Sequence, residues 1–551
     1  MLRTHHEYLY IYRCLHEKNF RYTAKVYLFC SMSPAILLFV IVLYFSVLLG
    51  IAFYTSRHST NESFFIGNRN SKWWLVAFGM IGTSLSGMTF ISVPGTVGLA
   101  DATGHIAGFN YFQVVIGYWL GYFVVAFVLL PLYYRLQLTS IYSYLDRRLG
   151  TNAYKTGSLF FILSRTLGAT IRLYLVIKVL QKFVLTDLGI SFEVTAVIIL
   201  ALILLYTYRG GVKTIVWTDT LQTTFMLLAL IICVGYIMHL LHLGPGDTWH
   251  AMQQKGYTSL LNTDVKNKDF FLKQILGGAF ITIAMTGMDQ EMMQKNISVS
   301  NLRDSKKNML TFCFVLLVAN FIFLLLGGLL YLYASAKGIA TSGDDIFPFI
   351  AVKSGLPFYI TVCFMIGLIS AVFPSADGAL TALTSSFCID IIGLKKRTGL
   401  SENQQKNIRL IVHNAFAVIF LAFVFFFRAV DNGSLIDILL KMAGFTYGPL
   451  LGLFTFGIIT RRKIAGKLPS LVCIGALIIT VMVDVANNAE WYIRKLKLDE
   501  ATSNALLKFS ANTFHGYKIG TELLIINASL TFFLLFLCSK KGGNVATAMP
   551  D

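Results

Sequence analysis

Charged residues are scarce in this chain. Asp, Glu, Lys and Arg make up 13% of its 551 residues, about half of the roughly 25% that soluble globular proteins carry. Hydrophobic residues reach 56%, and the mean hydropathy is +0.67. This composition excludes an ordinary soluble protein and predicts an all-α polytopic membrane protein that sits in a lipid bilayer.

Acidic residues are scarcer than basic ones, with 27 Asp and Glu against 46 Lys and Arg. The resulting net charge of +19 does not predict a nucleic-acid partner, because the basic residues gather mainly in alternate short loops. Basic loops of this kind lie on the cytoplasmic side of membranes. We therefore expect the N-terminus outside and the C-terminus in the cytoplasm. The basic loops are 57–72, 135–155, 295–307, 395–409, 461–467 and the tail at 540–541, whereas loop 488–518 is an exception.

Several motifs are absent. The eight Cys residues form no CxxC pair and mostly lie in apolar runs, which favours small packing residues over disulfides or a metal site. No Walker A loop, GxSxG or HExxH motif is present. The chain is therefore not expected to be an enzyme, and any pumping must draw on an ion gradient.

Residues 1–31 lack an apolar core of signal-peptide length, and Met32 directly precedes a good membrane helix. We interpret 1–31 as an extension that is possibly not native. A leading membrane helix (32–56), a ten-helix core (57–460) and C-terminal accessory helices with a short tail (461–551) follow. Thirteen spans are predicted, at 34–54, 73–97, 109–134, 157–184, 191–208, 219–243, 271–293, 309–334, 357–391, 407–428, 434–460, 465–487 and 519–538.

The span WWLVAFGMIGTSLSGMTFISVPGTVG (73–98) is interrupted by glycines, hydroxyl residues and a Pro-Gly pair. Such a stretch is either a small-residue packing face or a broken helix whose free carbonyl groups bind an ion. The span beginning at 271 is also broken by glycine, at Gly277, Gly278 and Gly287. Each opens a set of five spans, and an odd number per set predicts an inverted repeat of five plus five.

Two acidic residues lie inside spans, where an unpaired charge is costly. Asp377 belongs to ISAVFPSAD, in which Pro374 frees a carbonyl near Ser370. A cation is the favoured partner of Asp377, and a hydrogen bond to a neighbouring helix is the alternative. Asp219 lies near the start of its span, where a carboxylate next to the helix N-terminus is the simpler interpretation.

Two arginines, Arg165 and Arg172, share a helix face in SRTLGATIR. Arginine binds carboxylates through two hydrogen bonds, so one that points into a cavity would select an anionic solute. For Arg165 this role and a structural ion pair remain equal alternatives. For Arg172 a structural pair, or a side chain that reaches the membrane surface, is favoured.

Several segments in order resemble the sodium:solute symporter family across residues 55–460. They are SFFIGNRNSKWWLVAFGMIGTSLSG, YTYRGGVKTIVWTDTLQ, GMDQEMMQKNIS with Lys295 where Arg is usual, DDIFPFIAVKSGLP, ADGALTALTSSFCIDI and AGFTYGPLLGLFTFGIITRR. The resemblance implies the LeuT-type inverted-repeat fold, a broken first helix in each half and location in the cell inner membrane.

The resemblance also implies a sodium site. Its ligands would be the carbonyl groups of Gly82, Leu85 and Ala371 with hydroxyl groups at position 374 and Ser375. Pro374 stands where Ser is usual, so one ligand is missing, and Asp377 is a candidate replacement. A second sodium, held by some members, would involve Asp219, Ser375 and Asp377, although Gly378 stands where a hydroxyl would help.

For the solute, members similar to sialic acid transporters imply Ser86, Thr89, Gln113 and Arg165 as ligands. Thr282 and Met285 of the sixth core helix are also expected to contact the solute, and they argue against a hexose site. We therefore predict a monomeric sodium-coupled symporter that imports a sialic acid or another carboxylate by alternating access. The alternatives are a sodium- or proton-coupled symporter of a neutral sugar, polyol or amino acid, and a solute sensor without transport.

Overall fold

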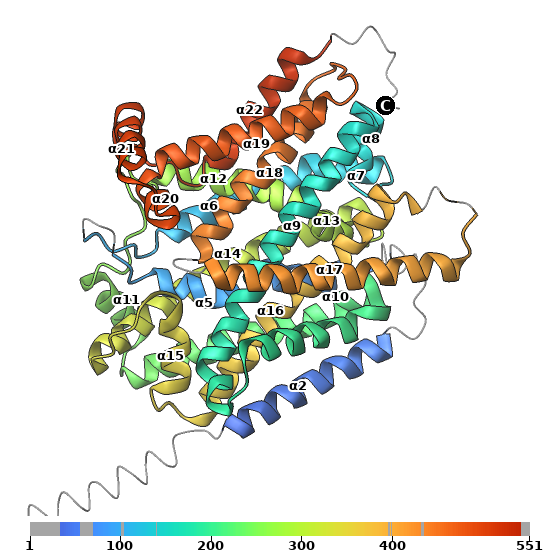
Figure 1. Cartoon of the computed structure of the whole chain (residues 1–551). Coiled ribbons are helices and arrows are strands. Elements are labelled where there is room, and N and C mark those ends of the chain that lie inside the picture. The colour runs from blue at the N-terminus through green and yellow to red at the C-terminus, as the bar shows by residue number, and fades with distance from the viewer. Residues whose placement is uncertain are drawn as a thin grey trace, which may run out of the picture.

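The computed structural model describes residues 34–55, 70–100, 104–138, 140–394, 397, 399–430 and 435–540. Helices dominate this part of the chain (Figure 1). The predicted extension 1–31 and residues 57–69 of the first basic loop lie outside the described residues.

Long apolar helices form because a backbone inside a bilayer must satisfy its hydrogen bonds within its own segment. The helices of the first half of the chain, long and short, are α2 (Pro34–Thr55), α4 (Trp73–Ser84), α5 (Gly87–Thr96), α6 (Tyr111–Val124), α7 (Leu130–Arg135), α8 (Ser143–Leu149), α9 (Thr151–Leu180), α10 (Phe192–Leu240) and α11 (Pro245–Gln254). Short π or 3-10 turns extend them at η2 (Val125–Leu129), η3 (Gln181–Leu185) and η4 (Thr186–Leu188).

The second half follows the same plan. Its helices are α12 (Phe271–Thr282), α13 (Gln290–Ile297), α14 (Leu302–Lys337), α15 (Ile346–Lys353), α16 (Phe358–Ser386), α17 (Glu402–Val430), α18 (Leu435–Ile459), α19 (Leu468–Asn487), α20 (Ala489–Leu496), α21 (Glu500–Phe514) and α22 (Leu523–Cys538). The short turns are η5 (Ile283–Gly287), η6 (Gly343–Asp345) and η7 (Phe387–Ile391).

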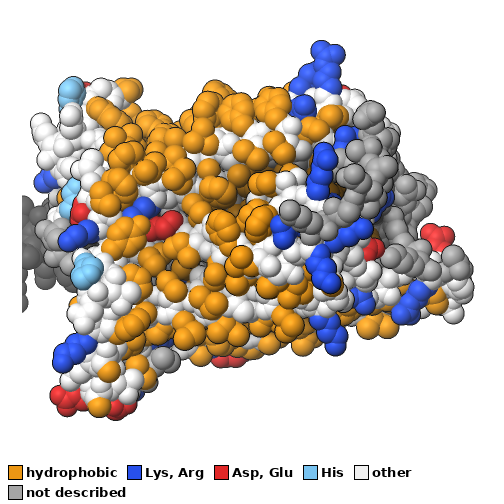
Figure 2. Space-filling view, turned by 90° about the horizontal axis from the view of Figure 1, so that it is seen from above, with side chains coloured by type: hydrophobic (Ala, Val, Ile, Leu, Met, Phe, Trp, Pro, Cys, Tyr) orange, Lys and Arg blue, Asp and Glu red, His pale blue; other side chains and the backbone are white. Residues whose placement is uncertain are grey.

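Each predicted span coincides with an apolar helix in the described ranges. Nine helices there are long and apolar enough to cross a bilayer, and two bent pairs raise this number to eleven. The two remaining predicted spans match the shorter apolar helices Phe192–Thr207 and Leu523–Cys538. Figure 2 shows a broad band of hydrophobic side chains across one face, with most of its Lys and Arg side chains toward one end. The chain is therefore a multi-pass membrane protein.

The first bent span consists of α4 and α5, which meet at 56°. Between them, Leu85 and Ser86 have ψ angles of 80° and 174°, so neither is helical. The break falls where the sequence predicts unwinding. Packing uses the same stretch, because a Cβ atom on Gly82 would overlap the hydroxyl of Thr223 on α10. A helix break and a close packing contact are therefore both present in this span.

The second bent span consists of α12, η5 and α13, with a bend of 63°. Asp289 begins α13, and its carboxylate accepts hydrogen bonds from the backbone N–H groups of Glu291 (2.9 Å) and Met292 (3.2 Å). Gly278 lies inside α12, where a Cβ atom would overlap the carbonyl oxygen of Val114 on α6. An interrupted helix is therefore confirmed here, but Gly278 serves helix packing and the break comes after Gly287.

Several helices gather around the first break. α16 packs against α4, α5, α9 and α10, and α18 also contacts α9 and α5. α2 lies at one edge of the bundle beside α10 and α16, and α19 and α22 lie at the opposite edge beside α18 (Figure 1). The two edges leave the break of α4 and α5 in the interior, where polar groups from several helices can meet.

Candidate functional site

A cavity of about 100 Å³ lies beside the break between α4 and α5. Its walls come from both halves of the core, because η5 and α13 of the second bent span also line it. Helix breaks and π turns expose backbone groups that a regular helix hides. The cavity is therefore the place where polar backbone and side-chain groups can reach a small molecule.

Five of the six residues predicted to contact the solute line this one cavity. They are Ser86, Thr89, Arg165, Thr282 and Met285.

Gln113, the sixth, does not line the cavity. Its amide nitrogen donates to the carbonyl oxygen of Leu260 (2.6 Å) and to Oδ1 of Asn110 (3.2 Å). The side chain therefore holds a loop against the start of α6. The residues of α6 that line the cavity are instead Tyr111, Tyr118 and Tyr122.

Arg165 lines the cavity but is held by acids of the protein. One of its terminal nitrogens contacts the Glu291 carboxylate, and the other lies 3.8 Å from Oδ2 of Asp289. The side chain is only 4% exposed. Both acids belong to the start of α13, so this ion pair fixes the second broken helix to α9. The contacts match the structural alternative that the sequence left open for Arg165.

Arg172 lies two turns further along α9 and lines the same cavity. Its side chain is 9% exposed. It forms no ion pair or hydrogen bond with the described residues, and its buried Nε atom has no hydrogen-bond partner among them. The expected structural pair or surface-reaching side chain is therefore not what the structure has. The cavity instead contains a buried guanidinium whose counter-ion is not supplied by the described protein.

The residues predicted to bind sodium belong to α4, α10 and α16 and to the break before α5, and these elements pack against one another. The ring of Pro374 lies 3.4 Å from the position of a Cβ atom on Gly82, so α16 touches α4 just before the break. The Ser375 hydroxyl donates to the carbonyl of Val372 (2.9 Å), and its lone pairs stay free to accept or ligate. Ala371 and Leu85 are also buried here. An all-oxygen set of this kind suits a hard cation.

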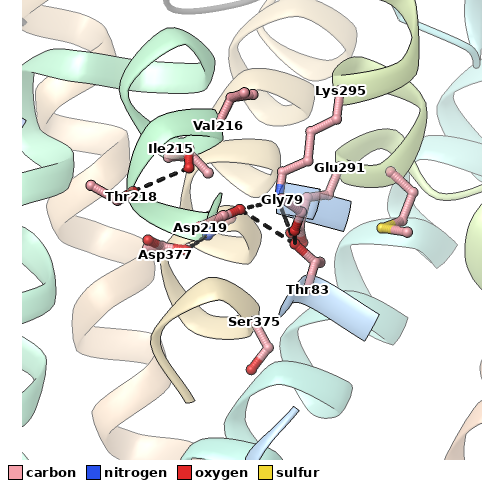
Figure 3. A network of polar contacts seen from close by, with 12 residues as sticks. Gly79, Thr83, Ile215, Val216, Thr218, Asp219, Glu291, Lys295, Ser375 and Asp377 are labelled. Carbon is pink, nitrogen blue, oxygen red and sulfur yellow. Dashed lines mark hydrogen bonds and ion pairs between the residues drawn. The ribbon is translucent and has the colours of Figure 1, made fainter. Parts of the chain in front are cut away.

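A buried network of charges adjoins this junction (Figure 3). The ammonium group of Lys295 lies 2.7 Å from Oδ2 of Asp219 and 3.3 Å from Oε1 of Glu291, and it donates to the Thr83 hydroxyl. The sequence places Lys295 in a basic loop. This placement is wrong, because Lys295 belongs to α13 and is 2% exposed.

Asp219 and Asp377 lie near each other beneath this lysine (Figure 3). Asp219 is fully buried, and its second oxygen, Oδ1, has no partner among the described residues. It is therefore more than a carboxylate at a helix start, since α10 runs through it unbroken. Asp377 accepts from the Tyr206 hydroxyl at 2.7 Å, and no described lysine or arginine pairs with it. The hydrogen bond to a neighbouring helix, which the sequence left as the alternative for Asp377, is therefore present, because Tyr206 belongs to α10.

Two groups of residues escaped the sequence reasoning. Tyr111, Tyr118 and Tyr122 share one face of α6, and this spacing was a usable signal. Glu291 and Lys295 are spaced i,i+4 in the polar run QEMMQKN. A surface loop explains such a run equally well, so only the three-dimensional structure identifies these two as buried partners.

The sequence is similar to the sequences of several known proteins. The model of the sodium:solute symporter family matches residues 64–469. A sodium/sialic acid symporter of Proteus mirabilis (strain HI4320) is 25% identical over 441 residues, which cover 75% of this chain and 82% of that protein. Sodium-coupled monocarboxylate transporter 2 of Mus musculus is 24% identical over 431 residues, 73% of this chain and 64% of that protein.

The fold also matches a solved structure. That structure, a substrate-bound outward-open state of a sodium-coupled sialic acid symporter, aligns with a TM-score of 0.74 at 18% identity and covers 92% of this chain and 99% of that chain. The predicted LeuT-type fold, with its broken helix in each half, is thereby confirmed.

Proposed function

We propose, from the premise that the chain belongs to the sodium:solute symporter family, that it imports a small organic anion through the cavity beside the α4–α5 break. Membership of the family makes the chain a sodium-coupled solute symporter and not an enzyme. The class of solute is the step that we add, and it rests on one observation.

That observation is the unpaired guanidinium of Arg172. A buried charge without a partner is costly, and the cost is recovered when a solute carboxylate arrives. Arginine presents a planar fork that fits a carboxylate through two parallel hydrogen bonds. Arg165, by contrast, already has Glu291 and Asp289. We therefore assign anion recognition to Arg172, with hydroxyl groups of Ser86 and Thr89 as further ligands.

The cavity favours a small anion. Its volume of about 100 Å³ is below the roughly 300–1,000 Å³ typical of ligand pockets. Apolar side chains such as Met88, Met285 and Leu439 form much of its wall. A short monocarboxylate fits this combination best. A sialic acid is the second candidate, because two relatives are named as sialic acid symporters; it would require the cavity to widen.

We propose that sodium binds beside this cavity. Its ligands would be the carbonyl groups of Gly82, Leu85 and Ala371 and the hydroxyl of Ser375, with Asp377 in place of the missing hydroxyl at position 374. Leu85 lines the cavity, so sodium at its carbonyl holds the break in one shape. Sodium and solute then raise each other's affinity, and each tenfold of mutual effect corresponds to about 1.4 kcal/mol.

The alternating charge of the loops supports an orientation with the N-terminus outside and the C-terminus in the cytoplasm. We place the protein in the cell inner membrane and propose that it works as a monomer.

Thermal unfolding of the purified protein tests the proposal. Lactate and N-acetylneuraminate would be compared with lactamide and a neutral sugar, each in sodium chloride and in choline chloride. We expect only a carboxylate to raise the melting temperature, and only with sodium. Arg172→Gln should weaken carboxylate binding about ten- to hundredfold, because a hydrogen bond to a charged group is worth about 1.5–3 kcal/mol. Arg428→Gln, which removes an exposed partner of Glu193, is the control.

Stabilisation by the neutral solutes alone would favour a neutral-solute symporter and contradict the proposal of an anionic solute. So would an Arg172→Gln variant that binds the carboxylate as the wild type does.

A further inference from the structure

The ammonium group of Lys295 is fully engaged. A lysine has three N–H donors, and three oxygens surround this one: the Thr83 hydroxyl on α4, Oδ2 of Asp219 on α10 and Oε1 of Glu291 on its own helix. All three partners are at least 98% buried. The group thus holds together α4, α10 and α13 from a position between three oxygen ligands (Figure 3), as a bound monovalent cation would.

Glu291 fills the neighbouring space. A Cβ atom on Gly378 would overlap its carboxylate, so any side chain at position 378 would collide with Glu291. Lys295 and Glu291 lie one turn apart on α13 and enter this space together. The ion pair of Lys295 and Glu291 therefore fits here because position 378 has no side chain.

The charges of the network can be counted. Three acids, Asp219, Asp289 and Glu291, are linked to two bases, Arg165 and Lys295. The formal charge is −1, and Asp377 next to it makes −2. One sodium ion near Asp377 would bring the total back to −1. Without the Lys295 charge, the same acids would need one more cation, because uncompensated buried charge is costly.

We propose that Lys295 is a tethered substitute for a coupling ion: its ammonium group takes Asp219 out of sodium coordination and leaves Asp377 as the ionised ligand of a single sodium site. The number of sodium ions bound is then set by one side chain of α13. This inference uses the sodium coupling of the family and does not depend on the solute.

Direct binding of radioactive sodium to the purified protein, without solute, tests the inference. The wild type should bind about one sodium ion per chain. Lys295→Gln removes the charge and should bind about two, with a sodium dependence of thermal stability that becomes steeper. The double variant Lys295→Gln/Asp219→Asn removes the uncovered carboxylate and should return to about one.

Lys273→Gln is the matched control. Lys273 is another buried lysine, on α12, but its partners are the carbonyls of Asn267 and Lys518 and, at 3.8 Å, Glu522. Sodium binding should not change in this variant.

A wild type that binds about two sodium ions overturns the proposal, and this measurement needs no variant to fold. Lys295→Gln with about one bound ion also overturns it. Because no solute is present, failure of the anion proposal leaves both results intact, and the reverse holds as well.

Discussion

Replacing Arg165 and Arg172 in turn separates a structural arginine from a ligand-binding one. Both belong to α9, lie two turns apart and line the same cavity, with exposures of 4% and 9%. Their surroundings differ, because only Arg165 has acidic partners. Arg165→Met and Arg172→Met remove the same group from the same helix, so each variant is the control for the other.

The structure gives the size of the expected effect. At 3.8 Å from Asp289, the attraction felt by Arg165 is about 4 kcal/mol at an effective dielectric constant of about 20, and the closer Glu291 adds to it. Breaking a buried pair from one side costs about 3–5 kcal/mol. We expect Arg165→Met to lower the melting temperature strongly. Arg172→Met should leave it equal or higher, since it removes a buried charge that has no partner.

The assay is thermal unfolding in detergent followed by tryptophan fluorescence, with and without sodium. Arg165→Met/Glu291→Gln should recover part of the lost stability, because the orphaned carboxylate is removed as well. Wild-type stability in Arg165→Met together with loss of carboxylate binding would refute this reasoning. It would return the anion-binding role to Arg165 and make Arg172 dispensable.

Two further substitutions test the helix junctions. Pro374→Ser supplies a hydroxyl beside Gly82 and should increase sodium affinity about fivefold, since one neutral polar contact is worth about 1 kcal/mol; unchanged half-saturation in a sodium titration of thermal stability would argue against a sodium site here. Gly117→Ala should destabilise by about 1–3 kcal/mol, because its Cβ atom would overlap the backbone carbonyl of Ile275 on α12. Gly235→Ala, where a Cβ atom meets nothing within 4 Å, is its control, and equal melting temperatures for both would contradict the packing account.

Much of the fold could be predicted from the sequence, because membrane spans are recognisable by their length and apolar composition. A break within 73–98 was one of the two interpretations that the sequence supported, since clustered glycine and serine weaken a helix. Gly277 and Gly278 show the limit of that signal, because glycine serves close helix contacts as well as breaks. Only the approach of α6 shows which use applies at Gly278.

The site was harder to predict, because it depends on contacts between side chains of different helices. Arg165 and Arg172 share a face, so their spacing alone could not tell which one faces an acid. The deciding partner, Glu291, stands 126 positions along the chain. The same holds for Lys295, whose sequence neighbours include Asn296 and Ser298 and resemble a polar loop. Its burial follows from the bend before α13, which turns this polar helix inward.

Uptake into proteoliposomes tests the central claim most directly. The purified protein would be reconstituted, and entry of radioactive lactate or N-acetylneuraminate would be measured at fixed pH with an inward sodium gradient or with choline in its place. Accumulation of the carboxylate that stabilises the protein is expected with sodium only, and Arg172→Gln should abolish it. Undiminished uptake in choline, or sodium-driven uptake of a neutral solute that Arg172→Gln leaves intact, would contradict the account.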